Sequence, residues 1–155
     1  MNSKKGFTLI ELVIVLVVVG LSSAVAIPAG TNLANTARRS STQKELKELQ
    51  VAIMGDPDTG LLGFRDHIGA LPNSLDELYD NSGGGAYPAF DNFTQRGWNG
   101  PYIQNNDGDN DGTPDVLQDG WGNSYVYNSG TGTITSWGAD QAAGGGDDIV
   151  ANVNL

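Results

Sequence analysis

A long apolar segment with a single acid near its start constrains this chain more than any other feature of the sequence. The segment runs from Phe7 to about Ala29, follows Lys4-Lys5-Gly6, and carries Glu11 close to its beginning. About 20 apolar residues are enough for a helix to cross a bilayer. A carboxylate at the centre of such a helix costs on the order of 2.5 kcal/mol or more, so an acid there indicates a function and a partner.

Three interpretations of this segment compete. Its length suits a plain transmembrane anchor. A secretory signal, with Lys4 and Lys5 as its positive region, would be cut after the small residues Ala24-Val25-Ala26 and leave Ile27 first. Glu11 counts against that signal because it falls inside the apolar core. The third interpretation is a signal that is cut after Gly6.

The motif Gly6-Phe7-Thr8-Leu9-Ile10-Glu11-Leu12 resembles the hallmark of the type IV prepilin and pseudopilin family. The resemblance implies that a prepilin peptidase cuts between Gly6 and Phe7 and methylates the new Phe7 amine. It implies that Glu11 pairs with the Phe7 ammonium of a neighbouring subunit, since a buried acid needs a neutralising cation. It also implies that Gly20 and Pro28, two poor helix residues, bracket a stretch that loses helical structure in filaments.

Three regions are expected along the chain. They are a leader over residues 1–6, an apolar membrane or filament-core helix over 7–30, and a globular head over 31–155. One helix is predicted from Phe7 to about Met54, so that its second half belongs to the head. Apolar residues at helical spacing predict the buried face of that half: Leu33, Ala37, Leu46, Leu49 and Ile53.

The last third of the chain is predicted to form short strands. Ser124–Asn128 and Thr133–Trp137 flank the turn residues 129–132, and Ile149–Ala151 predicts a third strand. Earlier in the chain, Ser74-Leu75-Asp76-Glu77 fits a capping box that starts a short helix. The predicted fold class is α+β: a long N-terminal helix packed on a small antiparallel sheet, with a loop-rich head.

Composition excludes several classes of function. The chain has no cysteine, so no disulfide is available although export predicts an oxidising compartment. The net charge of -10 argues against nucleic acid, which requires clustered positive charge. No nucleophile–base constellation, phosphate-binding loop or zinc spacing is present, so an enzyme is not expected. The one histidine, His67, is interpreted as an ordinary loop or core residue.

Acidic residues gather at the C-terminal end. Between Gly97 and Leu155 there are eight aspartates and no lysine or arginine, so these acids are expected to lack a basic neighbour. They form either a solubilising surface or ligands for a hard cation such as Ca²⁺, which takes six to eight oxygens.

Four stretches narrow the resemblance to the major pseudopilins of type II secretion systems. Gly100–Ile103 and Asp119–Tyr125 are similar to stretches of those proteins, with Gly120 in place of their usual proline. Ser136–Asp140 and Asp147–Ile149 match their calcium loop in type and spacing. The resemblance implies the calcium ligands Asp140, Asp147, Asp148 and main-chain carbonyls near Trp137. The alternative is a glycine-rich solvated tail.

A second calcium loop is predicted from the EF-hand-like pattern Asp-x-Asp-x-Asp-Gly. Its candidate ligands are Asp107, Asp109, Asp111, Thr113 and Asp115. Gln118 stands where an EF-hand has its bidentate glutamate, and the stretch resembles dockerin and thrombospondin type 3 loops equally well. The alternative is an Asp-Gly-rich turn.

The function expected from these features is that of a structural filament subunit. The resemblance implies a major pseudopilin that waits in the bacterial inner membrane and then polymerises with itself into a periplasmic pseudopilus. Prepilin peptidase, the inner-membrane assembly machinery and minor pseudopilins are the implied partners. A surface type IV pilin for adhesion, motility or DNA uptake is the close alternative, and a secreted calcium-binding module is a more distant one. The lack of cysteines and the calcium-loop match favour the pseudopilin.

Overall fold

The computed structural model describes residues 7–82, 86–108 and 110–153, apart from the side chains of residues 22–31. The chain divides into two compact units, Met1–Thr36 and Ala37–Leu155. We call the second one the C-terminal unit.

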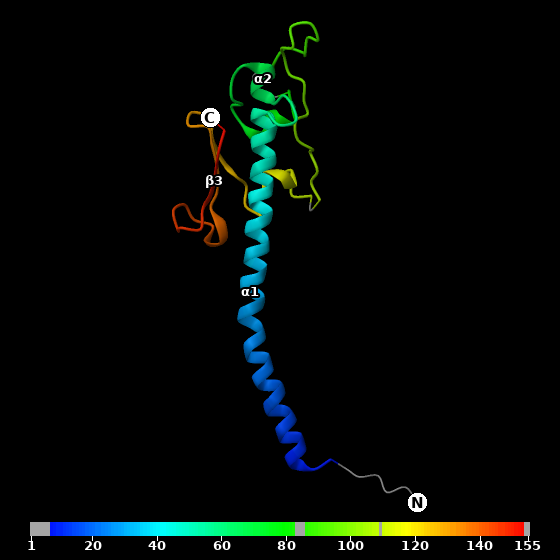
Figure 1. Cartoon of the computed structure of the whole chain (residues 1–155), viewed down its shortest axis with the longest axis vertical. Helices are drawn as coiled ribbons and strands as arrows, with labels where there is room; N and C mark the ends of the chain where they lie inside the picture. The colour runs from blue at the N-terminus through cyan, green and yellow to red at the C-terminus, as the bar shows by residue number, and fades with distance from the viewer. Residues whose placement is uncertain (1–6, 83–85, 109, 154–155) are drawn as a thin grey trace, which may run out of the picture. The chain divides into compact units, whose positions relative to one another are not determined.

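The N-terminal helix α1 spans Leu9–Met54 and is drawn blue to cyan in Figure 1. It ends where predicted, at Gly55, whose φ of +77° a residue with a side chain adopts only at a cost. The helical period correctly identifies Leu46, Leu49 and Ile53, which are all buried. The same period fails for Leu33, which is 72% exposed, and for Ala37, because no core of the described chain covers those positions.

A three-stranded antiparallel sheet follows late in the chain. Its strands are β1 Val126–Asn128, β2 Thr133–Ser136 and β3 Ile149–Asn152, in the order β1-β2-β3. The register pairs Tyr127 with Ile134, and Ile134 with Ala151. The predicted strands and turn are confirmed, with each strand within two residues of its expected limits. The α+β fold class is therefore also confirmed.

Short helices fill the loop-rich middle of the C-terminal unit. They are α2 Phe64–Ile68, which the sequence did not predict, and the 3₁₀ helices η1 Leu75–Leu78, η2 Asp115–Leu117 and η3 Gly138–Asp140. The capping box predicted at Ser74 is wrong, because the Ser74 side chain makes no capping bond. Glu77 accepts the N–H of Asn73 instead, at 2.9 Å.

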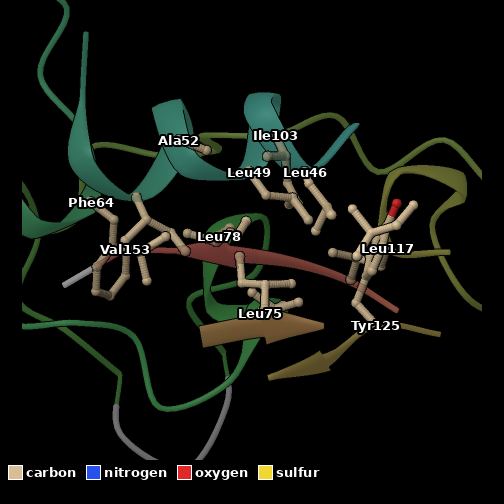
Figure 2. Packing of buried hydrophobic residues seen from close by; sticks show 14 residues of the cluster. Leu46, Leu49, Ala52, Phe64, Leu75, Leu78, Ile103, Leu117, Tyr125 and Val153 are labelled. Atoms are coloured by element: carbon tan, nitrogen blue, oxygen red, sulfur yellow. The ribbon is translucent and has the colours of Figure 1, made fainter. Parts of the chain in front are cut away.

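The core lies between the C-terminal half of α1 and the sheet (Figure 2). Leu46, Leu49 and Ala52 face it from the helix, and Val153 faces it from the opposite side. Phe64 is fully buried and makes edge contacts with the rings of Tyr87 and Tyr102. Burying such aliphatic and aromatic side chains contributes about 1.5–3 kcal/mol each, which makes this cluster the main stabilising element of the unit.

Polar contacts fix the loop before β1 against α1. The Tyr125 hydroxyl donates to Glu45 Oε2 at 2.9 Å, and burial together with this carboxylate raises the pKa of Tyr125. The Gly120 N–H donates to the Oγ1 of the buried Thr42 at 2.9 Å. A Cβ on Gly120 would lie 2.5 Å from the carbonyl oxygen of Arg38. The loop therefore approaches the helix backbone as closely as only glycine allows.

Candidate functional site

The N-terminal motif begins α1 with a reciprocal cap. The Thr8 N–H and hydroxyl both donate to Glu11 Oε2, at 3.3 and 3.2 Å, and the Glu11 N–H donates to Thr8 Oγ1 at 3.4 Å. This Thr-x-x-Glu capping box was missed in the sequence, although its spacing is a recognised signal. Within one chain Glu11 is exposed, and so is Phe7, at 87%. Gly6 lies outside the described residues.

The helix runs without interruption through Gly20 and Pro28 in the single chain. A Cβ on Gly20 would meet nothing within 4 Å. The loss of helical structure between these positions is expected of a filament, and it stays a prediction for this chain. Among the described residues, no helix combines the length and the apolar character that a membrane span requires.

The predicted C-terminal calcium loop folds back on itself. Oδ2 of Asp147 accepts the N–H groups of Ala139 and Asp140, at 2.6 and 3.1 Å. Both bonds lower the pKa of the Asp147 carboxyl, and the bond from the Asp140 N–H has the larger effect. Gly144 and Gly146 both have positive φ, at +97° and +89°, which lets the chain reverse between Asp140 and Asp147.

Two of the three predicted acidic ligands lie close together, and the third has a buried oxygen. Oδ2 of Asp140 and Oδ1 of Asp147 both lie within 3 Å of the point where a Cβ on Gly145 would stand. Oδ1 of Asp148 is buried and has no hydrogen-bond partner in the described part of the chain. Carboxylate oxygens are ligands of the kind that Ca²⁺ prefers.

The fit is incomplete when judged by acids alone. In residues 7–82, 86–108 and 110–153, no three histidine, cysteine or acidic side chains are grouped closely enough to hold a metal by themselves. A calcium ion would therefore also need main-chain carbonyls, such as those expected near Trp137, which directly precedes η3 and is 38% exposed.

The loop has a basic neighbour, contrary to the expectation from the sequence. Arg39, on α1, donates from Nη1 to the carbonyl oxygen of Asp147 at 3.2 Å, and its charge also lowers the pKa of the Asp147 carboxyl. The two residues are 108 positions apart. The distribution of charge along the sequence therefore could not predict this contact.

A buried carboxylate supports the start of the loop. Asp119 is 5% exposed, and its Oδ1 accepts the N–H groups of Trp121 and Asn123 at 3.0 Å. Its Oδ2 accepts the hydroxyl of Ser136 at 2.6 Å, and Ser136 Oγ in turn accepts the N–H of Gly138 at 3.1 Å. No role was predicted for Asp119. Its place in a motif beside Trp121-Gly122-Asn123 was the available signal.

The predicted second calcium loop forms a compact turn around its own aspartates. Asp107 accepts the N–H groups of Asp111 and Gly112, at 3.1 and 3.0 Å. Asp115 accepts the N–H of Gly108, and Gln118 donates to Asp111 Oδ2 at 2.6 Å. Thr113 donates its N–H to Asp111 Oδ1. Asp109 lies outside the described residues, and calcium binding by this loop stays a prediction.

Comparison with known proteins supports the prediction of a prepilin-like motif at the N-terminus. Residues 1–27 match the Prokaryotic N-terminal methylation motif. No solved structure matches the chain. The motif supports a type IV prepilin-like chain that is processed by a prepilin peptidase and assembles into filaments, which is a structural role and not a catalytic one. The α+β arrangement of a long helix and a small antiparallel sheet is consistent with a pilin-like fold.

Proposed function

We propose that this chain is the major subunit of a type II secretion pseudopilus, with a C-terminal loop that binds calcium. The match of residues 1–27 to the methylation motif carries the filament part of the proposal. The absence of cysteine from the sequence favours the pseudopilus over a surface pilus, because many adhesive pilins close their C-terminal loop with a disulfide.

The calcium part of the proposal rests on chemistry at the C-terminal loop. Asp140, Asp147 and Asp148 would hold the ion together with carbonyl oxygens near Trp137. The buried, unpartnered Oδ1 of Asp148 supports this, because an unpaired buried carboxylate oxygen is costly without a cation. When bound, Ca²⁺ would neutralise the loop's acids and join its two ends, as a disulfide does in related pilins. The loop from Asp107 to Asp115 is proposed as a weaker second site.

The mature N-terminus tests the proposed function directly. The protein isolated from cells should begin at an N-methylated Phe7, as mass spectrometry of the intact chain would reveal. A Gly6→Ala variant should accumulate as the full-length precursor, because the peptidase needs a small, flexible residue at the cut. A first residue at Ile27 would instead indicate a secreted module, and normal processing of Gly6→Ala would contradict the assignment of the cleavage site.

A further inference from the structure

A buried series of hydrogen bonds leads from the turn before β1 into the C-terminal loop. It joins Asp119, Ser136 and Gly138, which we call the Asp119 bridge. Asp119 is 5% exposed and Ser136 is 1% exposed. Oδ2 of Asp119 accepts the Ser136 hydroxyl at 2.6 Å, and Ser136 Oγ accepts the N–H of Gly138 at 3.1 Å. Because the hydroxyl donates to a carboxylate, its proton has a fixed direction and its lone pairs are left for the Gly138 N–H.

The carboxylate end of the bridge is anchored in a rigid turn. Oδ1 of Asp119 accepts the N–H groups of Trp121 and Asn123 at 3.0 Å, and the Asp119 N–H donates to the Asn123 carbonyl at 2.8 Å. In the same turn, the Gly120 N–H donates to the buried Thr42 of α1 at 2.9 Å. The turn cannot shift without breaking several hydrogen bonds, so Asp119 is a fixed point from which the C-terminal loop is held.

The other end of the bridge lies against Asp147. Gly138 has a φ of +70°, and a Cβ on it would stand 2.7 Å from both the carbonyl oxygen and Oδ2 of Asp147. The next two residues, Ala139 and Asp140, donate their N–H groups to the same Oδ2, at 2.6 and 3.1 Å. Three successive N–H groups of η3 are therefore bound, the first by Ser136 and the other two by Asp147.

This arrangement determines which oxygen of Asp147 is left for a cation. The N–H groups of η3 occupy Oδ2, so Oδ1 is the oxygen that can face an ion. Oδ1 of Asp147 and Oδ2 of Asp140 both lie within 3 Å of the point where a Cβ on Gly145 would stand. If η3 were free to turn, both carboxylates would lose this orientation. The bridge therefore holds two predicted ligands in place without itself contacting the ion.

We infer that Asp119 and Ser136 are positioning residues for calcium binding by the C-terminal loop. The inference rests on the proposed calcium site and adds the residues that orient its ligands from behind. Replacing residues of this kind lowers metal affinity by about 10–100-fold. The physical reason is preorganisation, because a loop that is already ordered on folding loses little further entropy when the ion binds.

Calorimetric titration of the full chain in detergent with Ca²⁺ tests the inference. Every protein compared carries Asp111→Ala, which weakens the second predicted loop, and this single variant is the reference. Adding Ser136→Ala removes the hydroxyl between Asp119 and Gly138, and it should raise the calcium Kd about 10–100-fold. Adding Asp119→Asn should raise the Kd by a smaller factor, because the new amide can still donate to Ser136 Oγ.

A matched control separates affinity from stability. Tyr127→Phe also removes one hydroxyl, which is half-buried and donates to the Pro72 carbonyl at 3.0 Å, outside the C-terminal loop. Like Ser136→Ala, it should lower the melting temperature in chelator, but it should leave the calcium Kd unchanged. An equal rise of the Kd in both variants would contradict the inference, because affinity would then only follow stability.

The possible failures are distinguishable. If the reference protein binds no calcium, the calcium part of the proposed function fails together with this inference. If the reference protein binds calcium and Ser136→Ala binds it equally well, the inference alone fails. Should Ser136→Ala not fold, Asp119→Asn decides the question, and a Kd equal to that of the reference would overturn the role of the bridge.

Discussion

At the scale of single residues, the half-buried hydroxyl group of Tyr87 makes a charge-assisted contact in the C-terminal unit. The hydroxyl of Tyr87 donates to Glu77 Oε2 at 2.6 Å and accepts the amide of Asn73 at 3.2 Å. Burial, and after it this carboxylate, raises the pKa of Tyr87 to about 12. Since the pKa of tyrosine in an unfolded chain is about 10, the folded state keeps a proton that the unfolded state has lost between these two values.

The alkaline stability of the protein should therefore depend on Tyr87. Its contribution is fully present below pH ~10 and is lost as the pH rises towards about 12, so stability falls across this window. In Tyr87→Phe, the free energy of unfolding should fall less steeply between pH ~10 and about 12. The difference in slope corresponds to the one proton that Tyr87 keeps only in the folded state. Denaturant titrations at a series of pH values measure that slope. An unchanged slope in the variant would contradict the assignment, whatever its stability at pH 7.

At the scale of elements, regular periodicity was readable from the sequence and close packing was not. From Leu46 to Ile53 the helix Leu9–Met54 follows a repeat of 3.6 residues, and strands β2 and β3 follow a repeat of 2; both patterns are local. By contrast, α2 is five residues long, and one and a half turns carry too few periodic positions to be recognised. The contact of Arg39 with Asp147 depends on the tertiary fold alone.

In the candidate site, too, local features could be predicted from the sequence and tertiary contacts could not. The resemblance to the pseudopilins, in residue type and spacing, supplied the candidate ligands Asp147 and Asp148, and their binding of calcium stays a prediction. Residue type and spacing did not identify Ser136 and Asp119, whose hydrogen bond joins residues 17 positions apart. Nor did they explain Gly120, whose N–H is needed by Thr42 and whose place against Arg38 leaves no room for a side chain.

The approach of the loop to α1 gives a prediction at this scale. Gly120→Ala should destabilise the protein by about 1–3 kcal/mol, because the new Cβ overlaps helix backbone that cannot move aside. Gly130→Ala is the matched control, since its Cβ would meet only the flexible end of Asn128, at 3.3 Å. Thermal unfolding of both variants measures the difference. Equal melting temperatures would show that the loop does not pack on the helix as described.

At the scale of the whole molecule, we expect Glu11 to have two separable roles. Within one chain its carboxylate caps α1 through Thr8. In the proposed filament its charge neutralises the Phe7 ammonium of a neighbour. Glu11→Gln keeps an oxygen for the cap and removes the charge, whereas Glu11→Ala removes both.

Assembly should follow the charge and not the cap. Both Glu11→Gln and Glu11→Ala should leave the C-terminal unit folded and reduce filament formation strongly, because an unpaired buried cation costs about 3–5 kcal/mol. Electron microscopy of filament number and length, with circular dichroism as the folding control, measures the two effects. Normal filaments from Glu11→Gln would show that the cap, and not the ion pair, is what assembly requires.

Calcium should act on the whole molecule by stabilising its C-terminal loop. A ligand that binds only the folded state at a hundredfold excess over its Kd stabilises it by about 2.7 kcal/mol, a large share of the ~5–15 kcal/mol typical of a domain. Thermal melts of the full chain in detergent should therefore shift upward with Ca²⁺ relative to chelator. Magnesium should substitute poorly, because it requires tighter octahedral geometry and gives up water reluctantly.

Variants separate the contributions to this shift. Asp140→Ala should abolish it if the C-terminal loop holds the ion, whereas Asp111→Ala should preserve most of it. Arg39 partly neutralises the Asp147 region without calcium, so Arg39→Ala should lower the melting temperature more in chelator than in Ca²⁺ and widen the shift. A shift that survives in Asp140→Ala and disappears in Asp111→Ala would move the site to the loop from Asp107 to Asp115. Identical melts with Ca²⁺, Mg²⁺ and chelator would remove calcium from the account of this protein.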